Sequence, residues 1–220
     1  GRGGVGGRGA AQGMASGLNG TRGQADRPLG RDRAGFGRGE GAGIGVSETL
    51  EDALARGAAP IVELVGYGTS ADAYHLTAGA EDGSGARRAR QAAIRQGGIK
   101  PSDIQHLNAH ATSTPVGDKG EMAAIKAVFG DQNGVAVTST KSATGHLLGA
   151  AGGIEAIFTA LAIRDQIAPM TLNLENPDEA AQGIDIVRGE ARPMKIEYAL
   201  SNGFGFGGVN ASVLFRRWQP

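Results

Sequence analysis

One stretch of this chain restricts the possible folds more than any other. Residues 147–163 are predominantly apolar, rich in Gly and Ala, and interrupted by the charge of Glu155. A helix that is apolar on nearly all sides has to be covered all round, so we expect it to lie between two layers of a larger fold. A membrane span needs about 20 mostly apolar residues, and this stretch is shorter, which favours a buried helix.

Strand-like and helical segments alternate around this stretch. The sequence predicts helices at 48–56, 85–96, 118–129 and 146–164, of which the first three end at a glycine. It predicts strands at 42–46, 60–66, 104–108, 135–138, 184–187, 196–201 and 211–215. Alternation of this kind favours a layered α/β fold, and the three strands at the end favour a mixed sheet.

The first 45 residues differ from the rest, because 17 of them are Gly and seven are Arg. Gly loses the most backbone entropy on ordering, and such a segment has little apolar surface to bury in return. We therefore expect residues 1–26 to be disordered or artefactual, either a flexible basic arm or the product of a shifted reading frame.

The overall composition excludes several classes of function. With 22 basic and 22 acidic residues the net charge is zero, so no global field favours nucleic acid or an anionic membrane. The absence of Cys excludes disulfides, thiolate metal sites and a cysteine nucleophile, and it fits a reducing, cytoplasmic compartment. No signal peptide, nucleophile elbow or phosphate loop is recognisable, which argues against secretion and against serine or nucleotide hydrolases.

The first of three polar loops runs from Asn108 to Pro115 and follows a predicted strand. His110 precedes a run of hydroxyl side chains, and it is either a reactive imidazole or a histidine satisfied by those hydroxyls. His106 and His110 have the spacing of a helical metal pair. The segment is strand-like and lacks the glutamate of that motif, so we expect no metal.

The second loop, 138–146, carries Lys141 and leads into the apolar stretch. We expect His146 at the start of that helix, where the dipole disfavours an imidazolium. Lys141 nearby would also keep the ring neutral, as is needed to polarise a thioester carbonyl. Alternatively, the lysine caps a carbonyl and the histidine caps the helix.

The third loop, 201–210, matches the dinucleotide pattern G-x-G-x-x-G at Gly203, Gly205 and Gly208. The pattern fails on context, because a strand follows rather than a helix. Phe204 and Phe206 among these glycines indicate either a mobile apolar lip or a hairpin with packed aromatics.

Taken together, these loops resemble the ketosynthase family of the thiolase fold, specifically the 3-oxoacyl-[acyl-carrier-protein] synthases of bacterial fatty-acid synthesis. The resemblance covers roughly residues 27–216 and is carried by residues 39–43, 65–70, 108–118, 140–149, 152–153, 173–177 and 201–210. It implies a thiolase-like layered α/β fold, C-terminal half only, with a mixed five-stranded sheet and a buried central helix. Residues 27–59 would be the end of the N-terminal half, and residues 60–220 the C-terminal domain.

The resemblance also implies an activity, the decarboxylative Claisen condensation of malonyl- with acyl-carrier protein to 3-oxoacyl-carrier protein. His110 and His146 match the histidines that hydrogen-bond the malonyl thioester, and Lys141 matches the lysine that positions them. The implied substrate-binding residues are Thr112, Thr114, Asn202, Phe204, Gly205 and Phe206, with Phe206 as the moving gate. No cofactor is implied; the partners would be acyl carrier protein and, for the full-length parent, a second copy.

The chain departs from that family in lacking the cysteine nucleophile. Alone, it is expected not to complete the condensation and at best to decarboxylate malonyl-carrier protein slowly. A second hypothesis is a non-catalytic partner subunit, which has no chemical need for all of His110, Lys141 and His146. A thiolase is disfavoured, because thiolases carry a cysteine in this half.

The predicted helix 85–96 is basic, and we expect either a solvated face or a docking face for an acidic carrier protein. Its basic residues are Arg87, Arg88, Arg90 and Arg95.

Overall fold

The computed structural model describes residues 16, 22–131 and 134–219. The expectation that residues 1–26 are disordered or artefactual falls mostly outside the described residues, although residues 22–26 have a defined structure. Arg22–Gln24 form a 3₁₀ turn (η1), and the buried Asp26 carboxylate accepts a hydrogen bond from the Gly37 amide at 2.7 Å. The Asn173 side chain donates to the Gly23 carbonyl at 2.8 Å. Contacts to residues far along the chain order this segment despite its composition.

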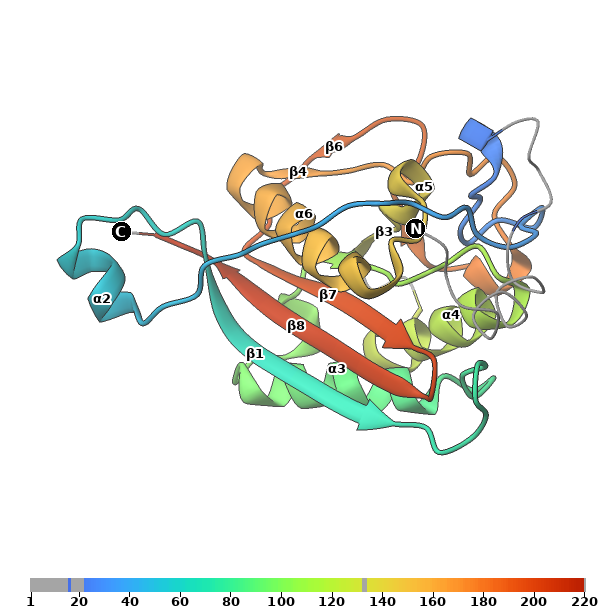
Figure 1. Ribbon diagram of the computed structural model, residues 1–220, viewed down its shortest axis with the longest axis horizontal. Coiled ribbons are helices and arrows are strands. Elements are labelled where there is room, and N and C mark those ends of the chain that lie inside the picture. The colour runs from blue at the N-terminus through green and yellow to red at the C-terminus, as the bar shows by residue number, and fades with distance from the viewer. Residues whose placement is uncertain (1–15, 17–21, 132–133, 220) are drawn as a thin grey trace.

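The predicted mixed sheet is confirmed, with six strands where five were expected. Their order is β1-β8-β7-β2-β3-β5 (Figure 1). The strands are β1 (Val62–Ala71), β2 (His106–Asn108), β3 (Ala136–Thr138), β5 (Asp185–Ile186), β7 (Tyr198–Gly205) and β8 (Val209–Arg217). β8 is antiparallel to β1 and β7, whereas β2, β3, β5 and β7 run parallel. A separate two-stranded sheet joins β4 (Ile167–Ala168) to β6 (Arg192–Pro193).

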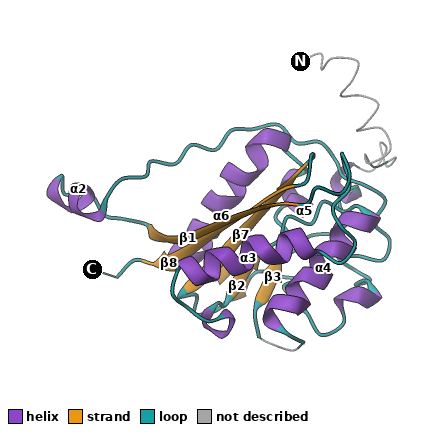
Figure 2. Cartoon of the chain, turned by 90° about the horizontal axis from the view of Figure 1, so that it is seen from below, coloured by secondary structure: helices purple, strands orange, loops and turns teal. Residues whose placement is uncertain are grey.

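Helices cover both faces of the sheet (Figure 2). On one face lie α3 (Ser84–Gln96) and α4 (Pro115–Phe129), and on the other α6 (Ala151–Asp165). β1 approaches α3 very closely, because a Cβ added at Gly66 or Gly68 would lie 2.3 or 2.1 Å from a backbone oxygen of that helix. Glycine is therefore required at these two strand positions. Short elements fill the connections: η2 (Pro101–Asp103), α5 (Lys141–Thr144), η3 (Leu148–Ala150) and η4 (Glu179–Ala181).

The apolar stretch forms α6, but the helix begins at Ala151 and not at His146 as predicted. The sheet-facing side is buried, whereas the opposite side is only partly covered; the partly covered residues include Ile154, Ile157, Phe158 and Leu161. Among the described residues, α6 is therefore covered by one layer, the sheet, and not by the two layers that were expected. No described helix is both long enough and apolar enough to cross a membrane.

Residues 40–48 cross α6 as an extended segment and lead to α2 (Leu50–Ala55), which stands away from the body of the protein (Figure 1). The strand predicted at 42–46 is wrong for this structure, because the segment has no strand beside it with which to pair. Its alternating apolar side chains face solvent instead: Ile44 and Val46 are each 86% exposed.

Candidate active site

The three polar loops meet because their strands are neighbours in the sheet. β2 ends at Asn108 and β3 at Thr138, and both run parallel to β7, which contains Asn202. Since the carboxyl ends of parallel strands lie at the same edge, the loops carrying His110 and Lys141 come together there.

The two predicted histidines lie side by side. The rings of His110 and His146 have centroids 5.4 Å apart and are nearly perpendicular, at 88°. Phe204 lies 5.4 Å from the His110 ring, and Phe36 lies 5.1 Å from the His146 ring. Aromatic residues from two distant parts of the chain therefore hold the histidine pair in place.

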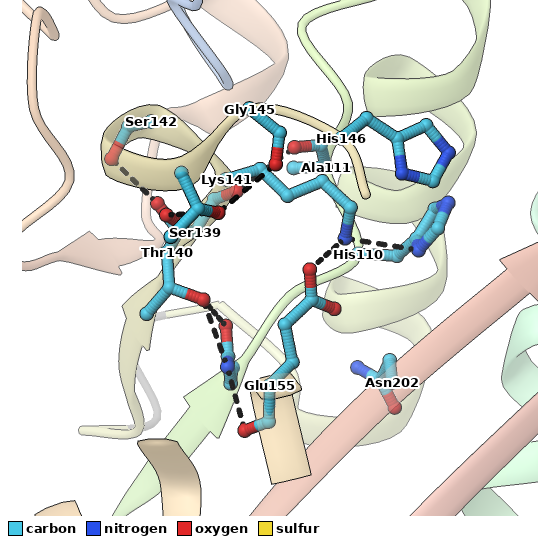
Figure 3. A network of polar contacts seen from close by, with 12 residues as sticks. His110, Ala111, Ser139, Thr140, Lys141, Ser142, Gly145, His146, Glu155 and Asn202 are labelled. Carbon is cyan, nitrogen blue, oxygen red and sulfur yellow. Dashed lines mark hydrogen bonds and ion pairs between the residues drawn. The ribbon is translucent and has the colours of Figure 1, made fainter. Parts of the chain in front are cut away.

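Lys141 reaches between His110 and a carboxylate that sequence reasoning missed (Figure 3). Its Nζ lies 3.2 Å from His110 Nδ1 and 2.5 Å from Glu155 Oε1, and both Lys141 and Glu155 are 1% exposed in their side chains. The one signal for Glu155 was a single charge inside an otherwise apolar helix. The alternative that Lys141 caps a carbonyl is wrong, because its ammonium group contacts His110 and Glu155 instead.

These contacts fix the tautomer of both rings. The Lys141 ammonium can only donate, so His110 Nδ1 accepts and its proton is on Nε2. The backbone N–H of Leu148 donates to His146 Nδ1 at 3.3 Å, which places the proton of His146 on Nε2 as well. Each imidazole thus carries an Nε2–H for which the described residues provide no acceptor, and which can donate to a ligand.

Both rings are neutral at pH 7. Burial and the Lys141 charge lower the pKa of His146 to about 4. Burial, then Lys141 and His146, hold the pKa of His110 well below its ordinary value. The neutral state was predicted, but the helix-dipole reason for it was wrong. His146 precedes α6 by several residues, and its backbone N–H donates to the Gly37 carbonyl at 2.7 Å.

Lys141 and Glu155 compensate each other's burial. Burial lowers the pKa of Lys141 and raises the pKa of Glu155, and in each case the partner's charge acts in the opposite direction. Such a pair is stable only while both members are present.

The predicted hydroxyl residues lie beside His110 but bond to one another. Thr112 Oγ1 and Thr114 Oγ1 are 3.0 Å apart. Thr112 lines a cavity of about 80 Å³ together with His110, Phe204 and Gly117. Ser113 Oγ accepts a hydrogen bond from the Arg27 amide at 2.9 Å. All three hydroxyls that could have satisfied His110 therefore have other partners.

The glycine- and phenylalanine-rich segment forms the β7–β8 hairpin, so the hairpin interpretation is confirmed for the backbone. Phe204 and Gly205 are the last residues of β7; Phe204 faces His110, whereas Phe206 at the turn is 50% exposed. The turn is tied to the chain after β1, because the Asp72 amide donates to the Gly208 carbonyl at 2.9 Å.

The predicted basic face of α3 needs one correction. Arg87, Arg88 and Arg95 are exposed, but Arg90 is 0% exposed and pairs with Glu121 of α4. A solvated or docking face therefore contains three arginines and not four.

A metal site is not supported by the residues that the structure describes. They contain no group of three His, Cys, Asp or Glu side chains able to hold an ion. His106 is fully buried in β2, where burial lowers its pKa to about 4.

The sequence around this site is similar to that of known proteins. Residues 61–175 match the family model described as beta-ketoacyl synthase, C-terminal domain. The chain belongs to the beta-ketoacyl synthase family. It is 54% identical over 196 residues to 3-oxoacyl-[acyl-carrier-protein] synthase 2 of Staphylococcus aureus, covering 89% of this chain and 47% of the relative. The synthase 2 of Rhizobium meliloti is also 54% identical, covering 89% and 46%. The chain thus spans about half the length of the curated relatives it matches.

Solved ketosynthase structures share the fold. The ishigamide ketosynthase/chain length factor is 36% identical with a TM-score of 0.87, covering 94% of this chain and 49% of the other. A type II PKS acyl-carrier protein in complex with its ketosynthase bound to the hexaketide gives 32% identity and a TM-score of 0.90, covering 98% and 53%. These likenesses confirm the thiolase-like ketosynthase fold that the sequence predicted.

Proposed function

We propose that this chain is the C-terminal half of a 3-oxoacyl-[acyl-carrier-protein] synthase that elongates fatty acids. The complete enzyme would condense malonyl- with acyl-carrier protein to give 3-oxoacyl-carrier protein, carbon dioxide and free carrier protein. The observation that carries the proposal is the pair of neutral histidines, each with a free Nε2–H, set beside the buried Lys141–Glu155 pair.

The chemistry needs hydrogen-bond donors where negative charge develops. When the malonyl carboxylate leaves as carbon dioxide, its bonding electrons pass into an enolate, and charge accumulates on the thioester oxygen. The Nε2–H groups of His110 and His146 would donate to that oxygen, and these bonds strengthen as the charge grows. The α-carbon then attacks the thioester that the nucleophile formed when it took the acyl group from its carrier protein. The thiolate of the nucleophile leaves and takes up a proton.

The remaining residues would guide the substrate. In this proposal Thr112 and Thr114 bind the arm of the carrier protein at the cavity beside His110. Asn202, Phe204 and Gly205 would shape the acyl side of the site, with Phe206 as the gate. Because the sequence has no Cys, the nucleophile must come from outside it.

The proposal extends to organisation and partners. Residues 27–59 would be the end of the N-terminal half and residues 60–220 the C-terminal domain. The complete protein would be a cytoplasmic homodimer served by acyl- and malonyl-carrier protein, with the exposed arginines of α3 as a candidate docking face.

The test is carbon dioxide release from malonyl-carrier protein by the folded chain. Release that is slow but clearly above that of His110→Ala and His146→Ala supports the histidine roles. Release equal to that of these variants, in protein with unchanged circular dichroism, would overturn them. Adding the cysteine-bearing N-terminal half of the Staphylococcus aureus relative tests the complete reaction, and 3-oxoacyl-carrier protein is the expected product.

The alternative is a non-catalytic partner subunit. It is favoured by the likeness to a ketosynthase/chain length factor structure. Such a subunit would bind an active ketosynthase without releasing carbon dioxide itself. The assembled histidine and lysine network favours the enzyme, and the decarboxylation assay separates the two.

A further inference from the structure

Arg90 is a charged residue in a position that should be apolar. It lies on the core side of α3, in line with the buried residues Ala86, Ala89 and Ala93. Its side chain is 0% exposed. A buried guanidinium group is costly unless its charge and its donors are satisfied, so its partners indicate what it does.

Those partners come from two other elements. Arg90 Nη2 donates to Glu121 Oε1 of α4 at 2.6 Å. Arg90 also donates to the Asn202 amide oxygen of β7, from Nε at 3.1 Å and from Nη2 at 3.2 Å, in the orientation that lets the amide nitrogen donate to Ser212. The guanidinium carbon lies 5.6 Å from the centre of the Phe204 ring, within cation–π range.

Glu121 connects Arg90 to the backbone of the loop that carries His110. Its Oε1 accepts from the backbone N–H of His110 at 3.1 Å, and its Oε2 accepts from that of Ala111 at 2.7 Å. Arg90 is thus one contact away from the backbone that carries His110, and it directly contacts the Phe204 ring that faces the imidazole.

We propose that Arg90 is a positioning residue of this site. Its guanidinium fixes the His110 loop through Glu121 and fixes Phe204 through the ring contact and Asn202, so that the imidazole and the phenyl ring are held against each other. The importance of this arrangement for catalysis rests on the proposed function; the positioning itself does not. The competing explanation is that Arg90 merely fills space in the core.

Electrostatics supports the same assignment. The Glu121 charge raises the pKa of Lys141, whose ammonium contacts His110. It also raises the pKa of Asp118, which burial alone already lifts, and that of Glu155. Arg90 is the positive side chain that pairs with Glu121, with Nη2 2.6 Å from Oε1 and both side chains buried.

The experiment compares Arg90→Met, Arg90→Lys, the double variant Arg90→Met/Glu121→Gln and the control Arg87→Met. Arg87 is an exposed arginine on the same helix. Hydrogen exchange of the His110 and Ala111 amides, measured by NMR at one pH, is the main readout, and it requires no catalysis. We expect exchange about tenfold or more faster in Arg90→Met, unchanged in Arg87→Met, and intermediate in Arg90→Lys.

The double variant separates positioning from space filling. Removing both charges leaves the Gln oxygen able to accept from one loop amide, so we expect it to regain part of the lost protection. Protection in Arg90→Met equal to that in Arg87→Met would overturn the proposal. The proposal would also be overturned if the His110 and Ala111 amides exchange as fast in the double variant as in Arg90→Met. If Arg90→Met fails to fold, a double variant that also fails to fold would overturn it.

Discussion

Replacing Lys141 by Met tests the central claim about the site, that Lys141 and Glu155 form a buried charge pair. The two groups lie 2.5 Å apart and both side chains are 1% exposed. Removing one partner of such a pair leaves an uncompensated buried charge and typically costs about 3–5 kcal/mol. We therefore expect Lys141→Met to lower the free energy of unfolding by about that amount at pH 7.

The double variant Lys141→Met/Glu155→Met should recover most of this loss, because apolar residues of similar volume often replace a buried pair at little cost. Lys126→Met is a matched control: the Lys126–Asp131 pair is longer, at 3.8 Å, and partly exposed, so its loss should cost about 1 kcal/mol or less.

Urea unfolding followed by circular dichroism measures all three variants, and an NMR titration of His110 adds an independent readout. The pKa of His110 should rise when the Lys141 charge is removed, yet stay below its ordinary value because burial is the larger cause. The reasoning is refuted if Lys141→Met costs no more than Lys126→Met. It is also refuted if the double variant is no more stable than Lys141→Met.

Three further predictions concern stability and association. The pKa of His106 is about 4 in the folded protein and near 6.5 in the unfolded chain, so acidification below pH 6.5 favours unfolding. The free energy of unfolding should fall by about 3 kcal/mol between pH 6.5 and pH 4 for this reason. His106→Leu should remove that part of the pH dependence, as measured by urea unfolding. Gly68→Ala should cost about 2–3 kcal/mol by thermal or urea unfolding, whereas Gly45→Ala, which has open space around it, should cost little. Ile44→Glu/Val46→Glu should reduce self-association in analytical ultracentrifugation without changing the free energy of unfolding.

Each of these predictions has a contrary outcome. Equal pH dependence in His106→Leu and the parent would mean that the buried imidazole does not titrate differently on unfolding. Asp118 contributes with the opposite sign, because its pKa of about 7 favours the native state at lower pH, but it cancels in the difference between the two proteins. Equal stability of the two alanine variants would contradict the close packing of β1 on α3. Unchanged association of the glutamate variant would mean that Ile44 and Val46 do not mediate self-association.

The polar loops were predictable because their signal is local. A strand, a histidine and a hydroxyl run follow one another within a few residues, and the sheet brings the loops together by its strand order. The error over His146 was also local: the apolar pattern continues smoothly from residue 147, and only the structure reveals the 3₁₀ turn Leu148–Ala150 before α6. Periodicity does not distinguish a helix from the irregular approach to it.

The residues that sequence reasoning missed owe their role to distant partners. Glu121 and Arg90 are 31 positions apart, and each lies on a helix whose charges look like an ordinary solvated surface. Glu155 is a single acid in an apolar helix and meets Lys141 only after folding. A charge on a helix cannot be assigned to the core from its own neighbours, because the groups that compensate it come from other elements.

The proposed function would give three unusual features of this protein a common cause. α6 is apolar all round but covered on one side, the segment at 40–48 exposes Ile44 and Val46 without a neighbouring strand, and the site assembles histidines without a nucleophile. In the proposed function, an N-terminal half would supply a second layer, a pairing strand and a reactive thiol. Since the chain spans about half of its relatives, a single N-terminal half would account for all three. If so, adding that half should protect the amides of 40–48 from exchange and cover Ile44 in the same step that restores condensation.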